Sequence, residues 1–85
     1  MKMISIFVTE NRTNNLEKSL GRFLQDYDRS TDIVNIYADA DRKDIVNSLQ
    51  AWNKGRRYPL GIMTADALKE TMAYLESYGA LYVTL

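Results

Sequence analysis

Strand-like apolar segments alternate along this chain with segments whose apolar residues recur every three to four positions, as in amphipathic helices. The expected strands are residues 3–9, 33–38, 60–63 and 80–85, with a helix in each interval. Strands that alternate with helices of this length form parallel sheets through right-handed crossovers. The sequence therefore predicts an α/β fold of order β-α-β-α-β-α-β, in which helices pack on the faces of a mainly parallel four-stranded sheet.

The first strand segment is apolar at nearly every position, which is typical of a strand covered on both faces. We therefore place it in the centre of the sheet, in an order such as 2-1-3-4. The chain has 85 residues, the size of one domain, so we expect residues 1–85 to form a single α/β domain. The strand residues expected to be buried are Ile4, Ile6, Phe7, Val8, Val34, Ile36, Leu81 and Val83.

Short polar residues and a glycine predict where the helices begin and end. Asp41 and Thr64 are expected to be the N-caps of the second and third helices. Asn14 with Glu17 three residues later resembles a capping box for the first helix. Gly79 is expected to stop the third helix before the last strand.

Composition excludes several classes of function. The chain has no Cys and no His, which removes disulfides, thiolate chemistry, imidazole bases and Cys/His zinc sites. The acidic run 39–44 does not match an EF-hand loop, and helix-start chemistry accounts for it. We therefore expect no metal and no cofactor, and an enzyme is the less favoured class.

Charge and hydropathy argue against two kinds of partner. Eleven Lys and Arg balance eleven Asp and Glu, so no overall field favours nucleic acid or an anionic membrane. No apolar run approaches the ~18 residues of a membrane span, and the first residues lack the pattern of a secretory signal. The expected location is the cytoplasm.

A polar segment after the first strand is the candidate ligand site. Because the order 2-1-3-4 would put the first and third strands side by side, Glu10, Asn11 and Arg12 would meet Thr64 and Asp66 at the carboxyl edge of the sheet. A helix start with an arginine suits a small phosphorylated ligand, although no glycine-rich phosphate loop is present. Glu10 and Asp66 are also the one carboxylate pair that such an edge offers for acid–base catalysis.

Two further segments are candidate partner-binding surfaces. A basic loop with an adjacent aromatic ring is formed by Arg56, Arg57 and Tyr58. It is suited to an acidic partner protein or to nucleic acid, or is simply a solvated helix end. The apolar arc of the third helix is widened by Tyr74 and Tyr78, and Tyr82 follows on the last strand. These tyrosines either form an exposed patch for association or fold down over the sheet margin with only their hydroxyls in water.

The βαβ unit, followed by a helix and then by Tyr58-Pro59 at the start of a strand, resembles the first two-thirds of a thioredoxin- or glutaredoxin-like domain over residues 3–63. The resemblance implies a cis-proline at Pro59. The family's redox cysteines would fall near residues 11–14, which are Asn-Arg-Thr-Asn, so no thiol redox activity is implied. The family closes with two strands and a helix, whereas this chain reads strand, helix, strand.

These observations together favour a small, non-catalytic protein-binding or regulatory module. Its size and its lack of catalytic residues resemble the small accessory or inhibitor proteins that bacteriophages and mobile elements encode. The expected partner is another protein, and homodimer formation stays open. The alternative is a binder of a small phosphorylated ligand, or a weak enzyme, at the carboxyl edge of the sheet.

Overall fold

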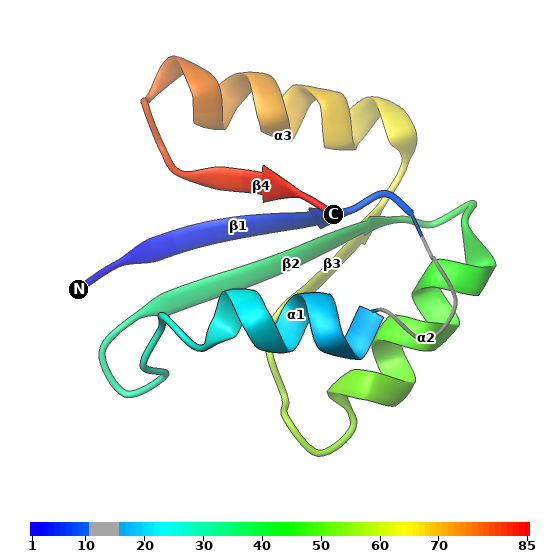
Figure 1. Cartoon of the computed structure of the whole chain (residues 1–85). Helices are drawn as coiled ribbons and strands as arrows, with labels where there is room; N and C mark the ends of the chain where they lie inside the picture. Colours follow the sequence, from blue (N-terminus) through cyan, green and yellow to red (C-terminus); the bar gives the residue numbers. More distant parts are fainter. Residues whose placement is uncertain (11–15) are drawn as a thin grey trace.

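A computed structural model shows the alternation of strands and helices that the sequence predicts (Figure 1). The structure describes residues 1–10 and 16–85. Its elements are β1 (Met3–Val8), α1 (Leu16–Leu24), β2 (Ile33–Asp39), α2 (Lys43–Asn53), β3 (Leu60–Met63), α3 (Ala65–Ser77) and β4 (Tyr82–Thr84).

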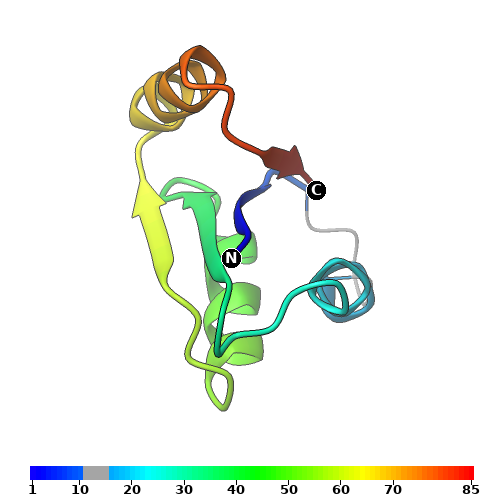
Figure 2. The same cartoon turned by 90° about the vertical axis from the view of Figure 1, so that its left-hand side faces the viewer.

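The four strands form one parallel sheet in the order β3-β2-β1-β4. The central place of β1 is confirmed, but the order 2-1-3-4 is wrong. Helices α1 and α2 lie on one face of the sheet (Figures 1 and 2). Their two crossovers therefore place β2 beside β1 and then β3 beside β2, on the same side of β1. Helix α3 lies on the opposite face and carries the chain back across the sheet to the free side of β1. The result is a three-layer α/β domain.

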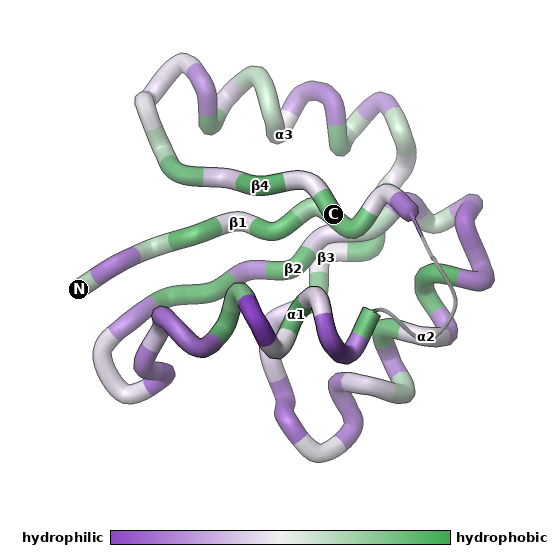
Figure 3. Tube along the Cα trace, viewed as in Figure 1, coloured by the Kyte–Doolittle hydropathy of each residue, from purple (hydrophilic) through white to green (hydrophobic). Residues whose placement is uncertain are grey.

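The main core lies between the sheet and the helices α1 and α2. Alternate residues of β1 and β2 point into it, and the helices cover them with four side chains. These buried residues are Ile4, Ile6, Val8, Val34, Ile36 and Ala38 from the strands, and Leu20, Ile45, Leu49 and Trp52 from the helices. Figure 3 shows the corresponding hydrophobic colour along β1.

Most of the predicted strand core is confirmed, with one error at the sheet edge. Val83 is only partly buried against the core. Leu81 is 64% exposed, and the prediction that it is buried is wrong. The strand begins at Tyr82, two residues later than predicted, so Leu81 precedes it at the outer edge of the sheet.

The face toward α3 is aromatic and less completely covered. Phe7 is 1% exposed, stacks on Tyr37 with ring centroids 4.9 Å apart, and meets the ring of Tyr82 edge-on at 5.8 Å. Helix α3 half-buries Leu68 and Leu75 on this side, yet none of its residues is fully buried. This helix therefore covers the sheet loosely.

The helix ends follow the predictions in part. The hydroxyl of Thr64 accepts a hydrogen bond from the Ala67 amide at the start of α3, and Gly79 ends this helix with φ 64°. At α2 the prediction is wrong, because Arg42 is the N-cap residue and the Asp41 amide donates to Oδ1 of Asp39 instead. The predicted cap Asn14 lies outside the described residues.

Two further expectations bear on fold and location. The Tyr58–Pro59 peptide bond is trans, whereas the thioredoxin-like resemblance implies a cis-proline there, so that part of the resemblance is not found. Within residues 1–10 and 16–85, no helix combines the length and the apolar character that crossing a membrane requires.

Candidate functional site

The carboxyl edge of the sheet does not gather the residues that the predicted ligand site requires. Strand β2 lies between β1 and β3, so the ends of β1 and β3 are two strand spacings, about 10 Å, apart. Glu10 follows β1, whereas Thr64 and Asp66 follow β3 at the sheet edge. The structure therefore separates these groups. Asn11 and Arg12 lie outside the described residues.

Arg42 also lies at this edge, a residue that no sequence motif singles out. Its guanidinium donates to the carbonyl of Thr9 at 3.3 Å and, through Nε and Nη2, to both carboxylate oxygens of Asp44 at 3.2 Å. The hydrogen bond from Arg42 lowers the pKa of Asp44, and the same bond, with the charges of Asp44, Asp39 and Glu10, raises the pKa of Arg42. The Arg42 guanidinium is therefore already bound by Asp44 and by the carbonyl of Thr9.

The topological switch point lies between β1 and β4, not between the first and third strands. The amides of Thr9 and Glu10 donate to the carbonyl of Leu85 at 2.8 and 3.1 Å, and the Thr9 hydroxyl donates to the same oxygen at 2.9 Å. The two described backbone donors of the predicted ligand segment, those of Thr9 and Glu10, are therefore occupied. In the part of the chain that the structure describes, no three carboxylates lie close enough to hold a metal ion.

Two of the three residues of the predicted basic loop, Arg56 and Tyr58, make contacts within the protein. The Arg56 guanidinium donates to the carbonyl of Trp52 and to Oε1 of Glu17 at 3.2 Å, and it lies 4.8 Å from the Trp52 ring centroid. Tyr58 stacks on Trp52 with centroids 5.6 Å apart, and the Arg29 guanidinium lies 4.0 Å from the Tyr58 ring centroid. Arg56 and Tyr58 thus join α2 to α1 and to the start of β3. No sequence pattern singles out Arg29, because its partners lie 27 and 28 residues further along the chain.

Arg57 differs from its neighbours. Its side chain is exposed, and its backbone has φ 60°, the left-handed conformation that side chains disfavour. Two donors of Arg29 reach the carbonyls of Arg56 and Arg57 and fix the loop in this shape. Arg57 is therefore the residue of the predicted basic surface that stays available to a partner.

No known protein family, curated protein or solved structure matches this chain.

For the tyrosines of the third helix, the sequence leaves two arrangements open, an exposed patch or rings folded over the sheet margin. Tyr74 is 62% exposed and Tyr78 is 72% exposed, so the alternative in which both rings fold over the sheet margin is wrong. The two rings lie one helical turn apart and contact each other, with centroids 4.7 Å apart and planes at 43°. We call Tyr74 and Tyr78 the tyrosine surface. Tyr82 is not part of it, because its ring is half-buried against Phe7.

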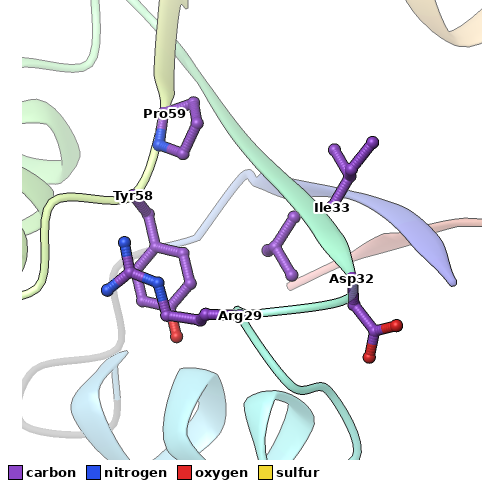
Figure 4. Close-up of a pocket in the computed structure, with 6 residues that line it drawn as sticks. Arg29, Asp32, Ile33, Tyr58 and Pro59 are labelled. Carbon is purple, nitrogen blue, oxygen red and sulfur yellow. The ribbon is translucent and has the colours of Figure 1, made fainter. Parts of the chain in front are cut away.

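A shallow pocket of about 250 Å³ opens beside the basic loop, where β2 and the residues before β3 diverge (Figure 4). It is lined by Arg29, Asp32, Ile33, Val34, Tyr58 and Pro59. Both carboxylate oxygens of Asp32 already accept a hydrogen bond, one from the Lys2 amide and one from the Asp28 amide, at 2.8 Å each.

Proposed function

We propose that this protein is a non-catalytic protein-binding module and that the tyrosine surface is the centre of its binding site. The observation that supports this proposal most strongly is the exposure of two adjacent large aromatic rings, at 62% and 72%. Exposing such rings to water gains nothing for a monomer, whereas tyrosine is enriched at interfaces because it combines apolar area with a polar tip.

The surroundings of the tyrosine surface suit an interface. Glu70 and Ser77 are exposed on the same side of α3 and supply the polar rim that surrounds the apolar centre of most interfaces. Leu81, three residues after Tyr78, adds an exposed apolar side chain. Such a module would regulate its partner by occupying a surface, in the manner expected of the phage accessory and inhibitor proteins that it resembles in size and in its lack of catalytic residues.

The test replaces both aromatic rings. Tyr74→Ser with Tyr78→Ser is compared with a matched double change on the far side of α3, Lys69→Ser with Glu76→Ser, where both side chains are also exposed. Wild-type protein is used to isolate a partner, and the purified partner is then titrated against all three proteins. We expect the tyrosine variant to lose ~2 kcal/mol or more of binding free energy, about 30-fold in Kd, at unchanged unfolding free energy.

Two results would contradict the proposal. One is equal affinity of the tyrosine variant and the control for the partner. The other is a fall in stability of the tyrosine variant without a change in association. Sedimentation of the wild-type chain alone is run in parallel, and a dimer that the tyrosine variant alone disrupts would identify a second copy as the partner.

The alternative function, binding of a small phosphorylated ligand at the carboxyl edge, is less favoured. Arg42 is ion-paired there, and the Leu85 carbonyl occupies the amides of Thr9 and Glu10. A titration with inorganic phosphate that shifts the amide signals of Thr9, Glu10 and Arg42 would favour this alternative instead.

A further inference from the structure

The pocket beside the basic loop lies where the ladder between β2 and β3 has not yet begun. The first paired residues are Ile36 and Leu60, and the amide of Ile36 donates to the carbonyl of Pro59 at 3.1 Å. Figure 4 shows Ile33 on one side of the opening and Tyr58 and Pro59 on the other. One wall of the pocket is thus the unpaired start of a strand.

The backbone of Val34 faces this opening. Along a strand, the N–H and C=O of one residue point to the same neighbour, and alternate residues point to opposite neighbours. The Ile33 amide donates to Lys2 on the β1 side, and the Ile36 amide donates toward β3, so the N–H and C=O of Val34 point toward residues 57–59. No backbone hydrogen bond joins Val34 to that segment, although Val34 is only 5% exposed.

Two residues prevent the ladder from closing at Val34. Pro59 has no N–H at the place where a parallel strand would donate to the Val34 carbonyl. The Arg57 carbonyl would accept the Val34 amide in a continued ladder, but it accepts Nη2 of Arg29 at 3.1 Å instead. The left-handed backbone of Arg57 turns the chain away from β2.

The far wall of the pocket is fixed. The side-chain amide of Asn53 accepts the Tyr58 amide at 2.7 Å and donates to the Tyr58 carbonyl at 2.9 Å. Stacking on Trp52 and Arg29 holds the Tyr58 ring. Backbone strain that is held in this way by its surroundings is found preferentially at functional sites. The opening is therefore maintained by specific contacts of the fold.

We propose that this pocket binds one apolar residue of an extended, acidic peptide segment from a protein partner. The peptide backbone donates to the Val34 carbonyl and accepts from the Val34 amide, as in strand addition. The apolar side chain contacts Ile33, Tyr58 and Pro59. A cavity of roughly 150 Å³ holds a benzene-sized group, so the pocket volume of about 250 Å³ is enough for one leucine-sized side chain.

Charge selects an acidic segment. Lys54 and Arg57 are exposed in the loop that leads to the pocket, and Arg29 lies at its rim. Asp32 is the carboxylate among the lining residues, so these three cations outnumber it around the opening. The site is separate from the tyrosine surface, so either proposal can fail without the other.

The first test uses the free chain. Amide hydrogen exchange is measured for Val34 and Ile36, which lie on the same strand and point to the same side. We expect the Val34 amide to exchange at least tenfold faster, because only Ile36 has a hydrogen-bond partner in the segment before β3. Equal protection of the two amides would show a closed ladder and overturn the proposal.

The second test uses short peptides. Acetyl-glutamyl-leucyl-glutamyl-amide is titrated into the labelled full chain, together with the same peptide N-methylated at leucine and a lysyl-leucyl-lysyl peptide. We expect shifts at Ile33 and Val34, and at least tenfold weaker binding of both control peptides. Equal binding of the N-methylated peptide, no binding of the acidic peptide, or shifts centred elsewhere would overturn the proposal.

A variant pair completes the test. Pro59→Ala supplies the missing donor opposite the Val34 carbonyl, and Lys69→Ala on α3 is the control. We expect Pro59→Ala to weaken the acidic peptide at least fivefold and to slow exchange at Val34, and Lys69→Ala to change neither. Unchanged peptide affinity in a folded Pro59→Ala protein, with slowed exchange at Val34, would show that the Val34 backbone does not bind the peptide.

Discussion

Gly61 in β3 is the position where a single added methyl group should have the clearest effect on stability. A Cβ at Gly61 would lie 2.5 Å from Cδ1 and 2.8 Å from Cε1 of Tyr37, and 3.3 Å from Cε of Met63. The Tyr37 ring cannot move freely, because it stacks on the buried ring of Phe7 at 4.9 Å. Gly61→Ala therefore forces this aromatic pair to shift.

Two effects of opposite sign decide the magnitude. Replacing glycine by alanine restricts the unfolded chain and stabilises the fold by ~0.4–1 kcal/mol where the site has room. Overpacking a filled site costs ~1–3 kcal/mol, and a lost aromatic pair costs ~0.5–1.5 kcal/mol. We expect Gly61→Ala to lower the free energy of unfolding by ~1–3 kcal/mol, out of a total of ~4–13 kcal/mol for a chain of this size.

Urea unfolding measures the change, and Gly21→Ala is the matched control. Gly21 lies within α1, and a Cβ there would meet nothing within 4 Å. Only the favourable effect remains, so Gly21→Ala should raise the free energy of unfolding by ~0.5–1 kcal/mol. If both variants are stabilised alike, the close approach of Tyr37 to Gly61 does not constrain the fold and the reasoning is refuted.

Two further predictions concern the core and the turn before β2. Phe7→Ala should lower the free energy of unfolding by ~3–5 kcal/mol in the same assay, because Phe7 is 1% exposed; a loss under ~1 kcal/mol would contradict its place in the core. Amide donors from Asp28 and Lys2 lower the pKa of Asp32 below 3.8, so its contribution to stability is present above this pH and is lost as the pH falls below it. The side-chain carboxyl signal of Asp32 should titrate with a midpoint below 3.8, and a midpoint above this value would contradict the hydrogen bonds.

The helices, the strands and much of the core can be predicted from the sequence. The limits of β3 and the ends of α3 at Thr64 and Gly79 follow from contiguous residues, because caps, stops and apolar periodicity act over one or two turns. The central place of β1 follows from its nearly continuous apolar run, since only a strand covered on both faces tolerates such a run. Element limits, helix ends and the burial of one strand depend on residues that are close in the sequence, so the sequence pattern is enough to predict them.

The strand order, and with it the place of each predicted site residue, depends on how the layers pack. The orders 2-1-3-4 and β3-β2-β1-β4 use the same elements and the same crossover hand, so no local pattern distinguishes them. That choice separated Glu10 from Asp66. It also placed Arg29 against the carbonyl of Arg57, 28 residues away, and so left the Val34 backbone without a hydrogen bond to the segment before β3. Contacts between residues this distant depend on how the layers pack, which no short stretch of sequence encodes.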